Sequence, residues 1–253
     1  SSAGQVAVRI YPADARELDR VSLEGLKVID YGAFVWVVLS SQELSGLDAA
    51  GINYLREENS YVLALGGQSF DPVLSPPKPV ISQSSVPTPD EPGLHLVQFF
   101  GPTQAAWLSR LENNGLAVVQ YIHPFTYVVW GSVIALETIA QQDFVRWTGD
   151  FLPAYAVLPV NRTLNSDPIP VRVLVYNQAS IDKVTQAVEA SGGSLVDTAL
   201  EVDPVFSLAT YTLPGDQLQA IAGLPGVYSL QPIPTEGGNR GEMSNQVSVG
   251  NYN

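Results

Sequence analysis

A chain of 253 residues, 45% hydrophobic and only 15% charged, can bury a sizeable apolar core, which excludes an intrinsically disordered protein. Its net charge of −13, with lysines and arginines scattered along the chain, excludes binding to nucleic acid or to an anionic membrane through phosphate contacts. The absence of cysteine excludes disulfides, thiol catalysis and cysteine-ligated zinc, and the longest apolar run, residues 33–39, is shorter than the roughly 20 residues that span a bilayer.

Hydrophobic periodicity predicts strands and helices in the order βαββαβ over residues 1–69. Ser40 opens the second helix of this stretch and directs Leu44 and Leu47 inward. The order is that of the ferredoxin-like split motif, so we assign residues 1–69 to a first ferredoxin-like unit. Its predicted elements are strands at 6–11, 26–30, 34–39 and 61–65, and helices at 15–23 and from residue 40.

Residues 70–93 hold seven prolines among serine, threonine and glutamine, a composition typical of a stiff linker. The βαββαβ order recurs over residues 94–159, where Ser132 caps a helix whose expected buried side carries Ile134, Leu136 and Ile139. Residues 160–170 form a second linker. The other predicted elements of this second unit are strands at 94–100, 116–122, 126–130 and 144–147, a helix at 103–113 and an extended segment at 151–157.

Residues 171–234 repeat the pattern a third time. Ser180 caps a helix with Val184 and Val188 in one apolar stripe, and glycines 192 and 193 end it. The chain is therefore predicted to be α+β, with three tandem ferredoxin-like βαββαβ units whose antiparallel sheets carry helices on one face. An extended tail at 235–253 follows. The strands of the third unit are predicted at 171–176, 194–199, 205–213 and 227–230, with a second helix opening at 214–216.

Alternation divides the residues of the third unit between two faces of its sheet. The pattern leaves open which set faces the helices. One predicted set is Val171, Val173, Val175, Phe206, Leu208 and Thr210, and the other is Arg172, Leu174, Tyr176, Val205, Ser207, Ala209 and Tyr211.

A search for catalytic motifs predicts that the chain is not an enzyme and holds neither cofactor nor metal. It contains no G-x-S-x-G elbow, P-loop, G-x-G-x-x-G or H-E-x-x-H sequence. The histidines His95 and His123 fall in or beside predicted strands and are interpreted as ordinary strand and turn residues. Asp197 begins an Asp-Thr-Ala that is superficially similar to the Asp-Thr-Gly of subtilisin-type proteases, but no His-Gly or Gly-Thr-Ser partner segment is present. The tryptophans Trp107 and Trp130 are expected in the core, not on a sugar-binding platform.

Two stretches of the sequence show a residue pattern that is more specific than the periodicity of strands and helices. In the second unit it comprises residues 96–102, Trp107, Leu108, Gly115 and residues 121–129; in the third it comprises the strand 171–176, glycines 192 and 193, and residues 218–227, which end in Leu-Pro-Gly-Val. These stretches resemble the N-terminal pro-regions of secreted subtilisin-like serine proteases (subtilases). The tail at 237–245 is similar to the join that precedes a catalytic domain in large bacterial members. The resemblance covers most of the second and third units and little of the first.

The resemblance implies a secreted propeptide that acts as an intramolecular folding chaperone and temporary inhibitor of a subtilase domain, in cis or in trans. It further implies that Glu201 and Asp203, between the second and third strands of the last unit, contact the protease by placing carboxylates at helix N-termini. The tail would then lie in the substrate cleft as an added strand, with its last residues, Gly250, Asn251, Tyr252 and Asn253, bound in the cleft and Asn253 as the candidate cleavage-site residue.

Two other readings remain open. One is a stand-alone extracellular binding or adhesion module in which tandem α+β units present a surface. The other is a small-molecule sensor, which would require a polar pocket between units, although the sequence contains no recognisable ligand signature.

Overall fold

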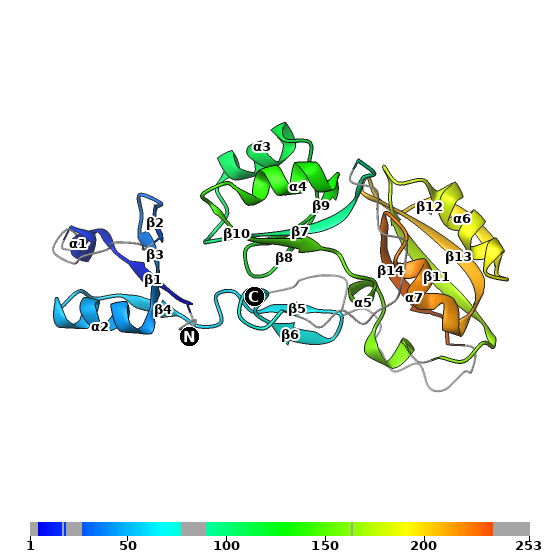
Figure 1. The fold of residues 1–253 in the computed structure, drawn as a ribbon, viewed down its shortest axis with the longest axis horizontal. Coiled ribbons are helices and arrows are strands. Elements are labelled where there is room, and N and C mark those ends of the chain that lie inside the picture. The colour runs from blue at the N-terminus through cyan, green and yellow to red at the C-terminus, as the bar shows by residue number, and fades with distance from the viewer. Residues whose placement is uncertain (1–4, 17, 19–26, 77–89, 163, 235–253) are drawn as a thin grey trace.

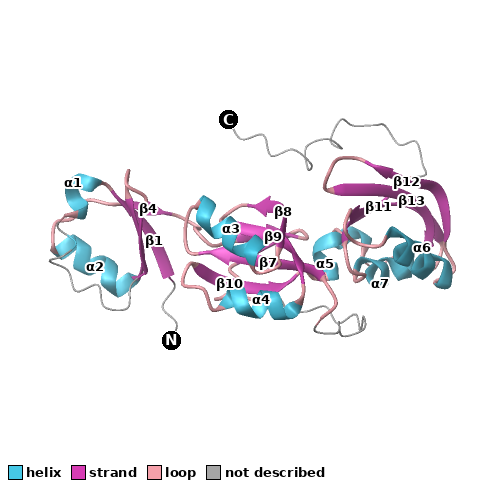
Figure 2. Ribbon diagram, turned by 90° about the horizontal axis from the view of Figure 1, so that it is seen from above, coloured by secondary structure: helices cyan, strands magenta, loops and turns pink. Residues whose placement is uncertain are grey.

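The computed structural model describes residues 5–16, 18, 27–76, 90–162 and 164–234. Within this part, the chain forms three four-stranded sheets with antiparallel pairing and one two-stranded hairpin, and short helices pack on the sheets. The predicted α+β class with antiparallel sheets is confirmed. The three sheets follow one another along the long axis of the molecule, with the second in the middle (Figures 1 and 2).

The first sheet has the strand order β2-β3-β1-β4. Its helix α2 begins with a capping box, in which the Ser40 hydroxyl accepts from the Glu43 amide and the Glu43 carboxylate accepts from the Ser40 amide. One sheet face packs with α2 around Val8, Val37 and Leu47. The elements are β1 (Gln5–Ile10), α1 (Pro12–Ala15), β2 (Lys27–Asp30), β3 (Val35–Ser40), α2 (Ser41–Ala49) and β4 (Leu55–Glu57).

The predicted closing strand of this unit at 61–65 was wrong. The strand that pairs with β1 is β4, whereas β5 (Leu63–Leu65) forms a hairpin with β6 (Gln68–Phe70). Gly66 and Gly67 both adopt positive φ angles, which a two-residue hairpin turn of type I′ requires. Because the turn is only two residues long, β5 pairs with β6, the next strand along the chain.

The second sheet has the order β10-β7-β9-β8 and carries α3 and α4 on one face (Figure 1). An aromatic cluster fills that side: the Trp107 ring lies 5.3 Å from both Phe99 and Phe144. Ser132 caps α4 as predicted, and Leu136 and Ile139 are buried, but Ile134 is exposed because it lies on the outer side of this helix. The elements are β7 (Gly93–Phe99), α3 (Ala105–Asn113), β8 (Ala117–Ile122), β9 (Thr126–Gly131), α4 (Val133–Ala140) and β10 (Val145–Asp150).

The segment between the second and third sheets is helical where an extended chain was predicted. Pro153 occupies the first turn of α5 (Pro153–Ala156), where its missing amide proton costs no hydrogen bond. The 3₁₀ helix η2 (Pro159–Asn161) follows. Ala156 and Val157 are buried in the core of the third unit, so this segment packs against that unit.

The third sheet has the order β12-β13-β11-β14, and its helices α6 and α7 share one face. Ser180 caps α6 as predicted, through a hydrogen bond from the Lys183 amide. The core between sheet and helices includes Val173, Val188 and Ile221. The elements are β11 (Pro168–Tyr176), α6 (Ile181–Ala190), β12 (Ser194–Glu201), β13 (Phe206–Pro214), η3 (Gly215–Gln217), α7 (Leu218–Ala222) and β14 (Val227–Pro232).

The predicted division of the third sheet into two faces was wrong for β13. Val173 lies opposite Ala209, and Leu174 lies opposite Leu208. Directly opposed residues share a face. The valines of β11 therefore face the helices together with Ala209, Tyr211 and Leu213, and Leu208 lies on the other face. Alternation within a strand cannot reveal this, because the relation between two strands depends on their register.

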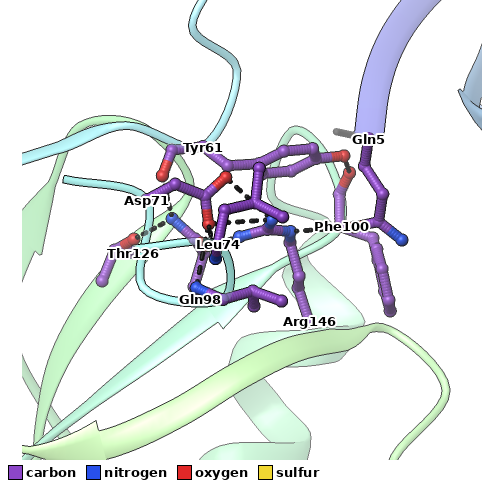
Figure 3. A network of polar contacts seen from close by, with 9 residues as sticks. Gln5, Tyr61, Asp71, Leu74, Gln98, Phe100, Thr126 and Arg146 are labelled. Carbon is purple, nitrogen blue, oxygen red and sulfur yellow. Dashed lines mark hydrogen bonds and ion pairs between the residues drawn. The ribbon is translucent and has the colours of Figure 1, made fainter. Parts of the chain in front are cut away.

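The first two units are joined by a buried polar network (Figure 3). The Arg146 guanidinium donates to both carboxylate oxygens of Asp71, to Gln98 and to Gln5, and it stacks 4.0 Å from the centre of the Tyr61 ring. Its side chain is only 1% exposed. The start of the proline-rich stretch is thus held against β10.

Candidate protein-binding surface

The face of the third sheet that lies away from α6 and α7 is buried and apolar at one end of its strands and exposed and polar at the other. At one end, Tyr176 and Phe206 are buried against the second unit, with the Tyr176 ring 5.4 Å from Trp130. The next residues across the sheet form a row that is apolar except for Ser229 of β14 and half-buried except at β12, and the row beyond is polar and mostly exposed. In the order β12, β13, β11, β14 these rows are Leu200, Leu208, Leu174 and Ser229, then Asp197, Thr210, Arg172 and Gln231.

Strand β12 forms the exposed edge of this sheet. All eight of its residues are exposed, and within the described part of the chain it pairs with β13 alone. Its large apolar side chains are left in solvent: Val196 is 54% exposed, Leu200 is 69% exposed and Val202, just after the strand, is 56% exposed. Two register breaks interrupt its pairing with β13. An exposed apolar edge of this kind is typical of a surface that another polypeptide covers.

The predicted site residues Glu201 and Asp203 both lie at the end of this edge and are exposed. Asp203 is engaged within its own turn, where its Oδ1 accepts from the amides of Val205 at 2.7 Å and Phe206 at 2.8 Å. The Asn177 side chain donates to the Asp203 carbonyl oxygen and so fixes the same turn. Glu201, the last residue of β12, makes no side-chain hydrogen bond or ion pair with the described residues.

The apolar residues of the edge were not predicted as site residues. Val196 fell in the predicted strand 194–199, and Leu200 and Val202 fell in the loop between the second and third predicted strands of this unit. A single sequence does not indicate which strand forms a sheet edge, so the sequence did not indicate their exposure. The predicted tail residues Gly250, Asn251, Tyr252 and Asn253 lie outside the described residues.

A cavity of about 560 Å³ adjoins the apolar row. It lies between the third sheet and residues of β5, β8 and α5. Burial raises the pKa of Tyr155 to about 12 and also raises the pKa of Tyr228, so both phenols remain neutral at physiological pH. The lining residues are Leu65, Gln120, Phe151, Tyr155, Arg172, Leu174, Val202, Asp203, Phe206, Leu208, Tyr228, Ser229 and Gln231.

The buried side chain of His95 links neighbouring strands of the second sheet. Its two ring nitrogens lie 3.1 Å from an Asp150 carboxylate oxygen and 3.1 Å from the Gly131 carbonyl oxygen. The hydrogen bond from His95 lowers the pKa of Asp150. This pair joins β7, β9 and β10 of one sheet, in agreement with the interpretation of His95 as a strand residue.

The described residues contain no group of three or more His, Cys, Asp or Glu side chains that could hold a metal ion. Trp107 and Trp130 are buried, as expected for core residues. None of the helices in the described ranges has the length and hydrophobicity needed to cross a bilayer.

Comparisons with known proteins give one local match. Residues 64–152, from within β5 to just beyond β10, match a family described as a domain of unknown function (DUF8729). The matched stretch joins the β5–β6 hairpin to the second unit, covers less than half of the chain and carries no assigned function. No curated protein matches the chain.

Among solved structures, a crystal structure of a protein from Thermus thermophilus aligns at 10% identity with a TM-score of 0.20. The alignment covers 91% of this chain and 41% of that protein, so the chain spans less than half of its length. A likeness at this level carries no argument about fold or function.

Proposed function

We propose that the chain is the pro-region of a secreted subtilisin-like serine protease, which guides the folding of the protease domain and temporarily inhibits it. The observation that carries the proposal is the exposed edge of the third unit, where Val196, Leu200 and Val202 are exposed along and just after the strand that ends in Glu201. The Glu201 side chain makes no hydrogen bond or ion pair with the described residues. This edge combines an apolar surface with a negative charge suited to a helix N-terminus.

The strand orders support the proposal. Numbered within its own unit, each of the three sheets has the order 2-3-1-4, with one helix after the first strand and one after the third. This is the arrangement of a ferredoxin-like βαββαβ unit, the type that the resemblance to subtilase pro-regions implies for the second and third units. We therefore propose that the chain is a tandem array of three such units.

Folding physics supports a chaperone role. A subtilase domain is a large parallel α/β fold, and non-local strand pairing makes such folds slow to form. An independently folded α+β unit that presents an apolar edge offers a template on which helices of the protease can assemble.

The test is inhibition of the subtilisin-like domain that we expect in the same gene. The full chain should inhibit that domain and raise its refolding yield. The double substitution Leu200→Asp, Val202→Asp should raise the inhibition constant at least tenfold, since it places charges in the buried contact. Val160→Asp is the matched control, because Val160 is 75% exposed but lies in η2, far from β12 in sequence, and should leave inhibition unchanged.

The proposal is wrong if the unsubstituted chain does not inhibit the protease, or if the double variant and Val160→Asp behave alike. A stand-alone extracellular binding module is the second candidate, favoured by the Arg146 network, in which the guanidinium donates to Asp71 and to Gln5 of the first unit and so joins units into one array. It predicts that a non-protease partner binds the chain and that protease activity is unaffected.

A further inference from the structure

The cavity beside the third sheet is assembled from segments that are distant in the chain. Its floor is the sheet face away from the helices, contributed by β11, β13 and β14. Its other walls come from Leu65 in β5, Gln120 in β8 and Tyr155 in α5. At about 560 Å³, it lies within the range of ~300–1,000 Å³ that is usual for small-molecule sites.

Aromatic rings that already contact one another form much of the wall. The Tyr228 ring lies 4.7 Å from Phe206 and stacks 5.5 Å from Phe151, which in turn lies 5.7 Å from Tyr155. These contacts fix the rings before any ligand enters. A site built in this way loses little conformational entropy when it binds an apolar group.

Arg172 supplies a positive charge at this apolar wall. In β11 it lies between Thr210 of β13 and Gln231 of β14, and its guanidinium makes no hydrogen bond or ion pair with the described residues. The other charged lining residue is Asp203, whose Oδ1 accepts from two amides of its own turn. Arg172 therefore retains its forked set of N–H donors for a ligand.

We propose that this cavity binds a monocarboxylate with an apolar body. The carboxylate pairs with the Arg172 guanidinium, whose planar donors match two carboxylate oxygens, and the apolar body lies among Phe151, Tyr155 and Tyr228. A single cation in a cavity that is also lined by the negative Asp203 favours a monoanion over a phosphate, which carries more charge than one guanidinium neutralises. The proposal concerns the isolated chain and does not depend on the pro-region function.

The experiment measures binding to the full chain by titration calorimetry with three probes: decanoate, phenylbutyrate and decanol. At least one carboxylate should bind with one-to-one stoichiometry, and comparison of decanoate with phenylbutyrate distinguishes an aliphatic from an aromatic body. Decanol has the same chain as decanoate without its charge and should bind at least tenfold more weakly, because charge-assisted hydrogen bonds are stronger than neutral ones.

The substitution Arg172→Gln should weaken carboxylate binding at least tenfold and leave decanol binding unchanged. Arg56→Gln is the matched control, since Arg56 is an exposed arginine of β4 that does not line the cavity, and it should bind the carboxylates as the unsubstituted chain does. Circular dichroism establishes that both variants are folded. The proposal is overturned if neither carboxylate binds, if decanol binds as tightly as decanoate, or if Arg172→Gln retains full affinity.

Discussion

Arg146 and Asp71, 75 residues apart in the sequence, form a two-pronged ion pair in which Arg146 Nη2 lies 3.0 Å from Asp71 Oδ1 and 2.9 Å from Oδ2. The Arg146 side chain is 1% exposed and that of Asp71 is 13% exposed. Because both charges are largely removed from water, each depends on the other for compensation. The pair therefore decides whether the segment after the β5–β6 hairpin stays attached to the second sheet.

We predict that Asp71→Ala destabilises the chain by roughly 3–5 kcal/mol, because it leaves the Arg146 charge buried without its partner. Urea unfolding measures this difference. Arg56→Gln is the control: it removes the exposed Arg56–Glu58 ion pair and should cost less than about 1 kcal/mol. Equal losses in the two variants would contradict a special role for the buried pair.

A second prediction concerns the hairpin turn that faces α5. Gly66 has a φ of +55°, and a Cβ atom added there would lie 2.2 Å from the Ala154 carbonyl oxygen. The Arg162 guanidinium donates to both the Gly66 and the Ala154 carbonyl oxygens, so a displaced turn would also lose these bonds. Gly66→Ala should therefore cost roughly 2–4 kcal/mol from backbone strain and overpacking.

Gly32→Ala is the matched control for this turn. Gly32 also has a positive φ, +74°, but an added Cβ would have no atom within 4 Å. It should lose only about 1–2 kcal/mol from the backbone conformation. If thermal denaturation gives the same loss for both variants, the close approach of Gly66 to α5 does not contribute.

A third prediction concerns acid stability. The hydrogen bond from His95 lowers the folded-state pKa of Asp150 below its unfolded value of ~3.9. A lowered carboxyl pKa stabilises the fold at pH values above the unfolded pKa, and this contribution is lost as the pH falls through the folded pKa. Asp150→Asn removes it.

Melting temperatures of both proteins, measured from about pH 5.5 down to about pH 2.5, test this prediction. The unsubstituted chain should melt higher than Asp150→Asn above about pH 4, and the gap should narrow at lower pH as Asp150 becomes protonated. A gap that stays constant or widens on acidification would be inconsistent with the lowered pKa.

A fourth prediction separates the two acidic residues at the end of β12. Asp203→Ala removes the acceptor of two amide hydrogen bonds and should cost about 1–3 kcal/mol, whereas Asp203→Asn keeps a side-chain oxygen and should cost less. Glu201→Ala should change stability by less than about 0.5 kcal/mol. Thermal denaturation tests these three expectations.

Under the proposed function, Glu201→Ala should nevertheless raise the inhibition constant for the protease domain. Inhibition assays on variants that remain folded test this second readout. Weaker inhibition by Asp203→Ala alone would indicate that the shape of the turn, and not a direct carboxylate contact, governs binding.

Local chemistry in the sequence was sufficient for many of the elements. Ser132 and Ser180 were predicted as helix caps, and each accepts a hydrogen bond from the amide three residues later. The α+β class followed from the alternation of strand and helix periods. These features depend on interactions within a few residues, so one stretch of sequence contains both partners.

Features that depend on distant partners could not be predicted in the same way. Residues 61–65 satisfy a strand pattern, but only the folded chain decides that β4 pairs with β1 and that β5 pairs with β6. The faces of β13 depend on its register with β11, which was predicted wrongly.

For the candidate sites, the sequence by itself determined that an acidic stretch containing Glu201 and Asp203 follows an apolar strand. Only the tertiary structure decided that this strand is an exposed edge, and that Leu65, Tyr155 and Arg172 line one cavity. The physical reason is that exposure and enclosure are set by which other segments pack nearby, and residues that meet across a hundred positions leave no periodic signal in either segment alone.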